Sequence, residues 1–140
     1  MNTILIRNAV LLQVAMLVDP SLDYTVEVQN IIDYILGTNP LNMTWVTGVG
    51  EYAVTNLHYR RGPYSGRISS PPAGFVPFGV GAYELCLEAY AKLSDYLSPD
   101  VAPMQCYIMS DCNNHTMSEF HEGTQGTPIM MFALSELINK

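Results

Sequence analysis

The sequence is short of charge, and of positive charge above all. Its 140 residues include 6 Lys and Arg against 13 Asp and Glu, which gives a formal net charge of −7 at pH 7. Binding to nucleic-acid phosphates needs clustered Lys and Arg, so this composition argues against a nucleic-acid partner. Uncharged ligands such as sugars are compatible with it.

Cysteine is also scarce. Three residues cannot form a complete disulfide framework, although one bridge with one spare thiol is compatible with the count. Cys106 and Cys112 lie six positions apart, which is not the close pairing of a zinc knuckle. A set drawn from His115, Glu119 and His121 matches no helical pair of metal ligands. We therefore predict no metal and no cofactor, and expect the cysteines to pack as small hydrophobic residues.

No hydrophobic run is long enough to span a membrane. The first twenty residues, "MNTILIRNAVLLQVAMLVDP", place one Arg before an apolar run, as a signal peptide does. However, Gln13 interrupts the run, Asp19 closes it, and no small-x-small cleavage site follows. The segment therefore predicts a core helix, and a helix that is apolar nearly all round is typical of a buried position.

Apolar residues are plentiful by contrast, at 49% of the chain, while charged residues make up 14%. The charged fraction is low for a soluble domain. The excess of apolar residues has two explanations: a tightly packed protein, or a piece of a larger core. The length allows one modest core.

Helical periodicity dominates the pattern, so the predicted fold class is all-α. The first helix is expected over residues 3–18. In the second, Ile31, Ile32 and Ile35 recur at helical spacing, with Ser21 as the N-cap and Gly37 after the last turn. A third is expected over 82–97, and a fourth begins near Pro128, a favoured first-turn residue.

Two long irregular stretches separate these helices, at residues 38–81 and 98–127. Loops of this length inside a compact domain are commonly functional. Helices that alternate with short turns and long loops indicate a helical toroid, with the functional site on the face that carries the long loops.

The first stretch contains "TWVTGVGEYAVTNLHYR" (residues 44–60). Gly48 and Gly50 permit backbone angles closed to other residues, so the chain can bend sharply there. Beyond the bend, His58 and Arg60 are two positions apart, and in an extended segment their side chains point the same way. Such a pair suits sugar hydroxyls or a carboxylate, although a surface loop with an incidental histidine fits about equally well.

The second stretch contains "NNHTMSEFHEGTQG" (residues 113–126). Glu119 stands between Met117 and Phe120, and apolar surroundings favour the protonated form that a general acid needs. Glu122 is close by. Composition and spacing alone do not choose between these two glutamates.

At this point the motifs resemble glycoside hydrolase family nine, the cellulases. "IDYILGTNPLNMTWVTGVG" followed by "LHYR" is similar to the family's D-Y-[IL]-L-G-x-N-P, S-[FY]-V-T-G-[FV]-G and P-H-H-R motifs. The matching positions are Asp33, Tyr34, Leu36, Gly37, Asn39, Pro40, Val46, Thr47, Gly48, Gly50, His58 and Arg60. "CYIMSDCNNHTMSEFHEGTQGTPI" resembles, more weakly, the segment that carries the family's general acid.

The resemblance implies a fold, an activity and site residues. The fold is a partial (α/α)₆ barrel, in which residues 1–140 form the C-terminal portion of one catalytic domain. The activity is hydrolysis of β-1,4-glucosidic bonds in cellulose or related β-glucans with inversion. Glu119 falls on the general acid, and His58 lies in the substrate cleft beside Arg60. The remaining implied residues are Asp111, near the usual acidic pair, and Trp45 and Tyr59 for substrate binding.

The sequence also departs from the family. Tyr52, Tyr59 and Ser118 replace residues that the family prefers, and Met109 and Ser110 occupy its usual acidic pair. The Asp-Ala-Gly-Asp motif that supplies the family's catalytic base does not occur. We therefore expect the isolated chain to be weakly active or inactive, with the N-terminal part of the domain as its partner. The family is mostly secreted, and secretion is the expectation here.

Two rival interpretations come from other classes of protein. A catalytically silent carbohydrate-binding module would use exposed aromatic rings to stack on sugars. The aromatic residues available for it are Trp45, Tyr52, Tyr59 and Tyr64. A helical interaction protein without affinity for sugar would make the glycine-rich loop and the His58–Arg60 pair a coincidence.

Overall fold

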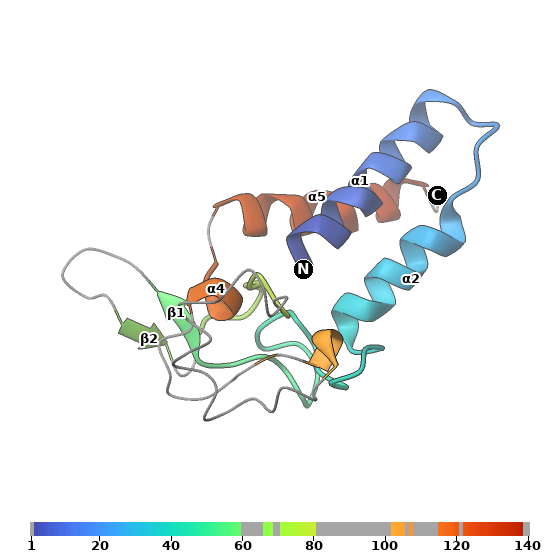
Figure 1. Cartoon of the computed structure of the whole chain (residues 1–140). Coiled ribbons are helices and arrows are strands. Elements are labelled where there is room, and N and C mark those ends of the chain that lie inside the picture. Colours follow the sequence, from blue (N-terminus) through green and yellow to red (C-terminus); the bar gives the residue numbers. More distant parts are fainter. Residues whose placement is uncertain are drawn as a thin grey trace.

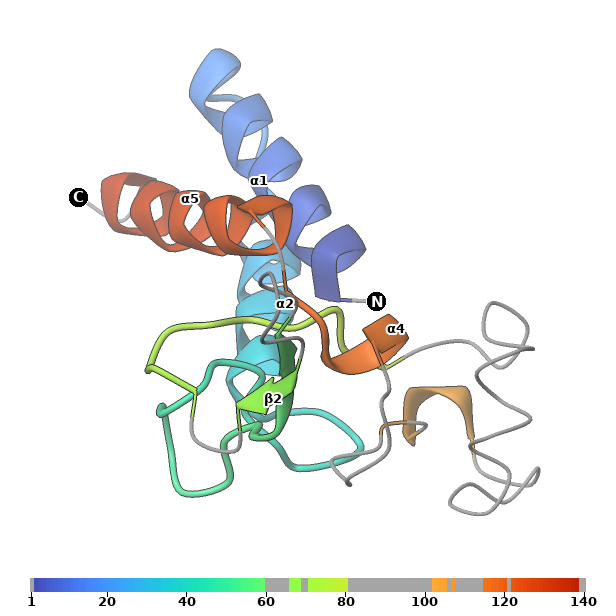
Figure 2. The same ribbon diagram turned by 90° about the vertical axis from the view of Figure 1, so that its left-hand side faces the viewer.

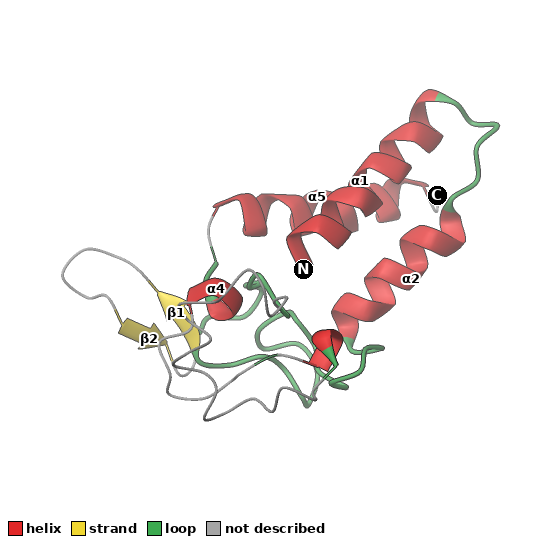
Figure 3. Cartoon of the chain, viewed as in Figure 1, coloured by secondary structure: helices red, strands yellow, loops and turns green. Residues whose placement is uncertain are grey.

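The computed structural model describes residues 2–59, 66–68, 71–80, 102–105, 107, 115–120 and 122–138. The long helices are α1 (Asn2–Val18), α2 (Thr25–Leu36) and α5 (Glu122–Ile138). The short elements are β1 (Leu57–Tyr59), β2 (Gly66–Ile68), the 3₁₀ turn η3 (Pro103–Gln105) and α4 (His115–Ser118). Figure 1 shows the long helices on one side of the molecule and the loops on the other. The all-α class is confirmed, with one small two-stranded sheet that was not predicted (Figure 3).

Helix α1 buries one face against the other two long helices. Its buried residues Asn2, Ile6, Ala9 and Gln13 recur every three or four positions, the spacing of a helix face. Helices α1 and α2 form an antiparallel hairpin, and α5 crosses α1 (Figure 2). The helix predicted over residues 3–18 is therefore confirmed, with a start one residue earlier.

Gln13, which interrupts the apolar run, ties two helices together. Its side chain is fully buried. The Nε2 group donates hydrogen bonds to the Met131 carbonyl at 2.9 Å and to the Ser135 hydroxyl at 2.7 Å, both on α5. A buried amide is costly without partners, so these bonds make this polar position in α1 compatible with the core.

Helix α2 has the predicted end but not the predicted cap. It begins at Thr25, whose N–H donates to the Asp23 carboxylate at 3.0 Å, a bond that holds the pKa of Asp23 below its ordinary value. Ser21 is not the N-cap, because the helix starts four residues later and Tyr24 holds the N-cap position. The Ser21 hydroxyl donates to the Asp19 carboxylate at 2.7 Å. At the other end Gly37 has φ 128°, and the Thr38 N–H reaches back to the Asp33 carbonyl at 2.8 Å. This left-handed residue confirms Gly37 as the stop signal.

Helix α5 begins six residues before the predicted start. Pro128 lies inside it rather than in its first turn. Proline has no N–H, so Pro128 gives no helical hydrogen bond to the Thr124 carbonyl one turn earlier. Next to it, the Thr127 hydroxyl donates to the Gly123 carbonyl at 2.9 Å. The helix predicted over residues 82–97 and the three cysteines lie outside the described residues.

The hydrophobic core extends from the helices under the loops. Its buried members are Ile6, Ala9, Val28, Ile32, Ile35, Met43, Trp45, Val46, Val54, Leu57, Val76, Val80 and Met131. The long helices also expose apolar side chains, among them Leu11 and Val18 on α1 and Ile129 on α5. No helix in the described part of the chain is both long enough and apolar enough to cross a membrane.

Candidate active site

Thr47 joins the glycine-rich turn to the loop at residues 71–80. Its side chain is fully buried. The hydroxyl donates to the Pro72 carbonyl at 2.6 Å and accepts from the Phe75 N–H at 2.8 Å. Its backbone adds two bonds, from its N–H to the Phe75 carbonyl at 2.9 Å and from the Gly74 N–H to its carbonyl at 2.8 Å. Two segments 25 residues apart in the sequence are thus fixed to each other by one threonine.

Gly48 makes this approach sterically allowed. Its φ is 70°, in the left-handed region that favours glycine. A Cβ placed on Gly48 would lie 2.8 Å from the Cβ of Ala73, closer than carbon atoms approach in folded proteins. The predicted sharp bend at this glycine is confirmed, and the loop packed against it supplies a second reason for the residue.

His58 lies at the centre of β1, beyond the turn. Strand β1 pairs with β2 in antiparallel fashion, and the partners are Leu57 with Ile68, His58 with Arg67, and Tyr59 with Gly66. Leu57 is fully buried and anchors the strand in the core, while His58 is 8% exposed. The imidazole therefore sits just below the surface, in a position fixed by the strand that carries it.

Glu119 directly follows α4 and lies beside His58. The two residues form an isolated parallel bridge between β1 and the segment after α4. On the Glu119 segment, the backbone carbonyls of Glu119 and Met117 accept bonds from the N–H groups of Phe78 (3.0 Å) and Gly79 (2.9 Å). Glu119 is half-buried. A carboxyl group and an imidazole from residues 61 positions apart are thereby brought onto adjacent backbone segments.

Gln125 on α5 holds the intervening loop in place. Its Nε2 donates to the Val76 carbonyl at 2.8 Å, and its Oε1 accepts from the Val76 N–H at 3.1 Å. A side-chain amide that pairs with both backbone groups of one residue acts as a short stretch of β-ladder. The loop held at Val76 reaches Glu119 two residues later, and the ring of Phe75 lies 4.4 Å from that of Phe120 between centroids. Gln125 therefore links the helix layer to the Glu119 segment.

Trp45 lies in the core. Its side chain is 0% exposed, and its ring meets that of Tyr107 edge-on at a centroid distance of 4.7 Å. A ring without an exposed face cannot stack on a sugar, so the structure corrects the prediction that Trp45 binds substrate. Burial raises the pKa of Tyr107 and that of Tyr34. The hydroxyls of both tyrosines and the indole nitrogen complete no hydrogen bond.

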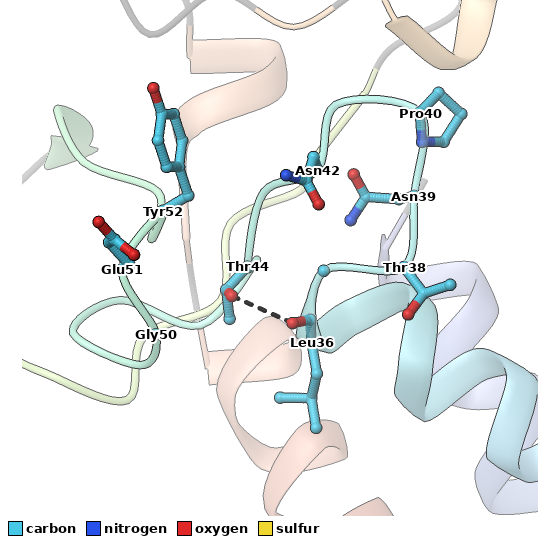
Figure 4. Close-up of a pocket in the computed structure, with 10 residues that line it drawn as sticks. Leu36, Thr38, Asn39, Pro40, Asn42, Thr44, Gly50, Glu51 and Tyr52 are labelled. Atoms are coloured by element: carbon cyan, nitrogen blue, oxygen red, sulfur yellow. Dashed lines mark hydrogen bonds between the residues drawn. The ribbon is translucent and has the colours of Figure 1, made fainter.

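A hollow of about 790 Å³ opens beside the glycine-rich turn. Figure 4 shows Glu51 and Tyr52 on one side of it and Thr38 and Pro40 on the other. The lining residues are Leu36, Gly37, Thr38, Asn39, Pro40, Asn42, Thr44, Gly50, Glu51 and Tyr52. This hollow thus lies between the end of α2 and the turn that leads towards His58.

Comparison with known proteins decides the family. Residues 2–85 match the family described as glycosyl hydrolase family 9. That match covers more than half of the chain and includes Thr47, Gly48 and His58. The chain belongs to glycosyl hydrolase family 9. The family resemblance seen in the sequence motifs is thereby confirmed, and so is the description of the fold as an all-α part of an (α/α)₆ barrel.

A curated protein is also similar to much of this chain. The family 9 chain is 32% identical, over 109 residues, to a cellodextrinase from Butyrivibrio fibrisolvens. The aligned region covers 76% of this chain and 19% of that relative. The family 9 chain therefore spans about a fifth of the length of the curated relative that it matches.

Of the six predicted site residues, His58 and Glu119 lie on adjacent segments in the described part of the family 9 chain. Arg60 and Asp111 lie outside the described residues. Tyr59 ends β1 opposite Gly66. Within the described ranges, no group of three His, Cys, Asp or Glu side chains is placed to hold a metal ion.

Sequence reasoning missed the hollow and the residues that clamp the loops. Thr47 and Gly48 were noted as motif positions, without the prediction that both face residues 72–75. For Gln125, the available signal was a side-chain amide six residues after the candidate acid. For the hollow, the available signal was the presence of two turn-forming segments close together in the sequence, "GTNP" (37–40) and "GEY" (50–52).

Proposed function

We propose that this chain supplies the proton-donating side of an active site that hydrolyses β-1,4-glucans with inversion. Glu119 acts as the general acid, and His58 binds the sugar next to the scissile bond. The observation that supports this most is the bridge between His58 and Glu119, which puts the two groups on neighbouring segments. The cellodextrinase relative supports a β-glucan as the substrate class.

Inversion needs two carboxyl groups roughly 6.5–9.5 Å apart, one to protonate the leaving oxygen and one to activate water. Glu119 is half-buried, and the strand beside it carries the imidazole that binds a sugar hydroxyl in this proposal. The second carboxylate lies outside these 140 residues in this proposal, because the Asp-Ala-Gly-Asp motif is absent from them. The isolated chain is then inactive or nearly so.

The remaining assignments belong to the same proposal. Arg60 donates hydrogen bonds to the substrate beside His58, Tyr59 contributes to sugar binding, and Asp111 lies near the acid. Residues 1–140 act as the C-terminal portion of one catalytic domain, and the rest of that domain is the partner. The whole protein acts outside the cell, where polymeric glucans are found.

A chimera tests the general acid. The matching segment of the Butyrivibrio fibrisolvens cellodextrinase is replaced by this chain, and hydrolysis of cellotetraose is measured. Glu119→Gln in the chimera is expected to lower kcat by about 10²–10⁴-fold, the usual contribution of a positioned proton donor. With a dinitrophenyl cellobioside, whose leaving group needs no protonation, the loss is expected to be much smaller.

Glu122→Gln is the matched control, because sequence reasoning alone did not separate the two glutamates. It is expected to keep the activity of the parent chimera on both substrates. Equal losses for Glu119→Gln on both substrates, or a larger loss for Glu122→Gln on cellotetraose, would overturn the assignment of the acid.

A further inference from the structure

We propose that the hollow between residues 36–44 and 50–52 is a second glucan-binding subsite, with the ring of Tyr52 as its sugar-stacking surface. This inference rests on the proposed function, because it concerns another part of the same polymer. Neither His58 nor Glu119 lines the hollow. It is therefore a separate contact surface from the candidate catalytic pair.

The lining selects a neutral, polar ligand. Among its ten residues one is charged, Glu51, and none is basic. A phosphate or carboxylate ligand would find no cation there and one carboxylate to repel it. The volume of about 790 Å³ lies in the range of small-ligand sites. Uncharged sugar units, which combine hydroxyl groups with apolar C–H faces, suit this chemistry.

The floor of the hollow is held rigid by hydrogen bonds. The Asn39 amide donates to the Tyr34 and Met43 carbonyls, at 2.8 Å each, and its Oδ1 accepts from the Leu41 N–H at 3.1 Å. The Thr44 hydroxyl donates to the Leu36 carbonyl at 3.1 Å (dashed in Figure 4). A site whose backbone is fixed before binding loses little entropy when a ligand arrives.

The rim offers groups that the fold does not use. The Tyr52 side chain is 70% exposed, although an aromatic ring of this size is usually packed. Asn42 is exposed as well, and its φ of 50° is a left-handed conformation in which asparagine is enriched. An exposed ring beside an exposed amide is the combination that sugar binding requires: one face for stacking and donors for hydroxyls.

The hollow also lies within reach of the candidate catalytic pair. The Thr44 N–H donates to the Tyr52 carbonyl at 2.8 Å, which closes the turn and fixes where Tyr52 stands. Tyr52 precedes His58 by six residues, a span of at most roughly 20 Å for extended chain. A cello-oligosaccharide of a few units can therefore contact Tyr52 and His58 together, and occupancy of the hollow would favour longer substrates.

Calorimetric titration of the full chain with cellohexaose tests the subsite. Tyr52→Ala is expected to weaken binding about tenfold, and Tyr52→Phe, which keeps the ring, is expected to bind as the wild type does. Ile129→Ala is the matched control, since Ile129 on α5 is also 70% exposed, and it is expected to change nothing. Circular dichroism establishes that each variant is folded.

A measurement on the wild-type chain covers the case in which Tyr52→Ala does not fold. With ¹³C-labelled tyrosine, the ring resonances of Tyr52 are expected to shift on addition of cellohexaose, while those of Tyr24, at the α1–α2 turn, do not. If binding persists in Tyr52→Ala, or the Tyr52 resonances stay fixed, while His58→Ala weakens binding, the subsite is overturned and the proposed function stands. If the wild-type chain gives neither heat nor shifts, the subsite is overturned, while the proposed function is decided separately by the Glu119→Gln chimera.

Discussion

The helix layer and the loop face of this protein are held together in different ways. Between α1, α2 and α5 the contacts are mostly apolar, with Gln13 as the main polar tie. The loop face relies on side chains that bond to backbone groups: Asn39 to those four and five residues away, and Thr47 and Gln125 to those of distant segments. Both regions share one core, yet the candidate active site lies entirely on the loop face.

This difference has a consequence for mutation. Apolar contacts in the helix layer are not directional, and one apolar side chain can often replace another. A substitution there therefore lowers stability without changing which segments pack together. On the loop face, Thr47 and Gln125 act as clamps, by which we mean side chains that bond one segment to the backbone of another. The loss of a clamp is expected to change the position of β1 relative to the Glu119 segment. We therefore expect helix-layer variants to act on stability, and clamp variants to act on stability and on the site.

The largest expected effect is in the helix layer. Met131→Ala removes a fully buried side chain of α5, and the cavity is expected to lower the free energy of unfolding by about 2–5 kcal/mol. Met130→Ala is the control, because Met130, the residue just before Met131, is 47% exposed. Its effect on the free energy of unfolding is expected to stay within about 0.5 kcal/mol. Urea unfolding measures both. Similar effects for the two methionines would show that α5 does not pack as described.

The second-largest effect on stability is expected at Thr47, a clamp on the loop face. Thr47→Val keeps the shape but leaves the Phe75 N–H and the Pro72 carbonyl without their partner, which is expected to cost about 2–4 kcal/mol. Thr38→Val, at an exposed threonine on a neighbouring loop, is expected to be nearly neutral. Hydrogen exchange at the Phe75 amide gives the local readout: unchanged protection in Thr47→Val would contradict the clamp.

Glycines in the two regions are expected to respond with opposite signs. Gly48→Ala places a Cβ against Ala73 at positive φ, and a loss of about 1–3 kcal/mol is expected. Gly126→Ala in α5 meets nothing within 4 Å and is expected to gain about 0.5–1 kcal/mol from helix propensity. Thermal unfolding of both variants compares them, and a loss at position 126 would contradict the helical assignment there.

The smallest effect concerns the buried tyrosine next to Trp45. The raised pKa of Tyr107 means that the folded state keeps the proton when the unfolded state loses it, near pH 10. Stability therefore falls as the pH rises above about 10, and part of that fall is expected to vanish in Tyr107→Phe. At pH 7 the change is expected to be within about 1 kcal/mol, because the hydroxyl has no partner to lose. Identical alkaline unfolding curves would contradict this burial.

Much of the fold could be predicted from periodicity alone. Helices α1 and α2 follow from apolar spacing, and Gly37 from its preference for a left-handed stop. The start of α5 could not, because Pro128 is a stronger signal than the glycine-rich sequence before it. Ser21 failed as a cap because the helix starts only at Thr25, four residues later, with Tyr24 at the N-cap position.

The candidate residues His58 and Glu119 came from the sequence, but the contacts that position them did not. The motif around His58 and the choice of Glu119 came from family resemblance. The clamps depend on contacts between segments far apart in the chain, such as Gln125 with Val76, which no local pattern encodes. The prediction that Trp45 binds substrate failed for a similar reason. Other segments of the chain bury its ring completely, and the local sequence does not reveal this.

The most direct test of the central claim is a nuclear Overhauser measurement on the isotope-labelled chain. The account predicts cross-peaks between the backbone protons of His58 and those of Glu119, since the two residues form a parallel bridge. It also predicts that cellotetraose shifts the amide resonances of both. Assigned spectra with no contact between residues 57–59 and 118–120 would contradict the account, because the imidazole and the carboxyl group would then belong to separate regions.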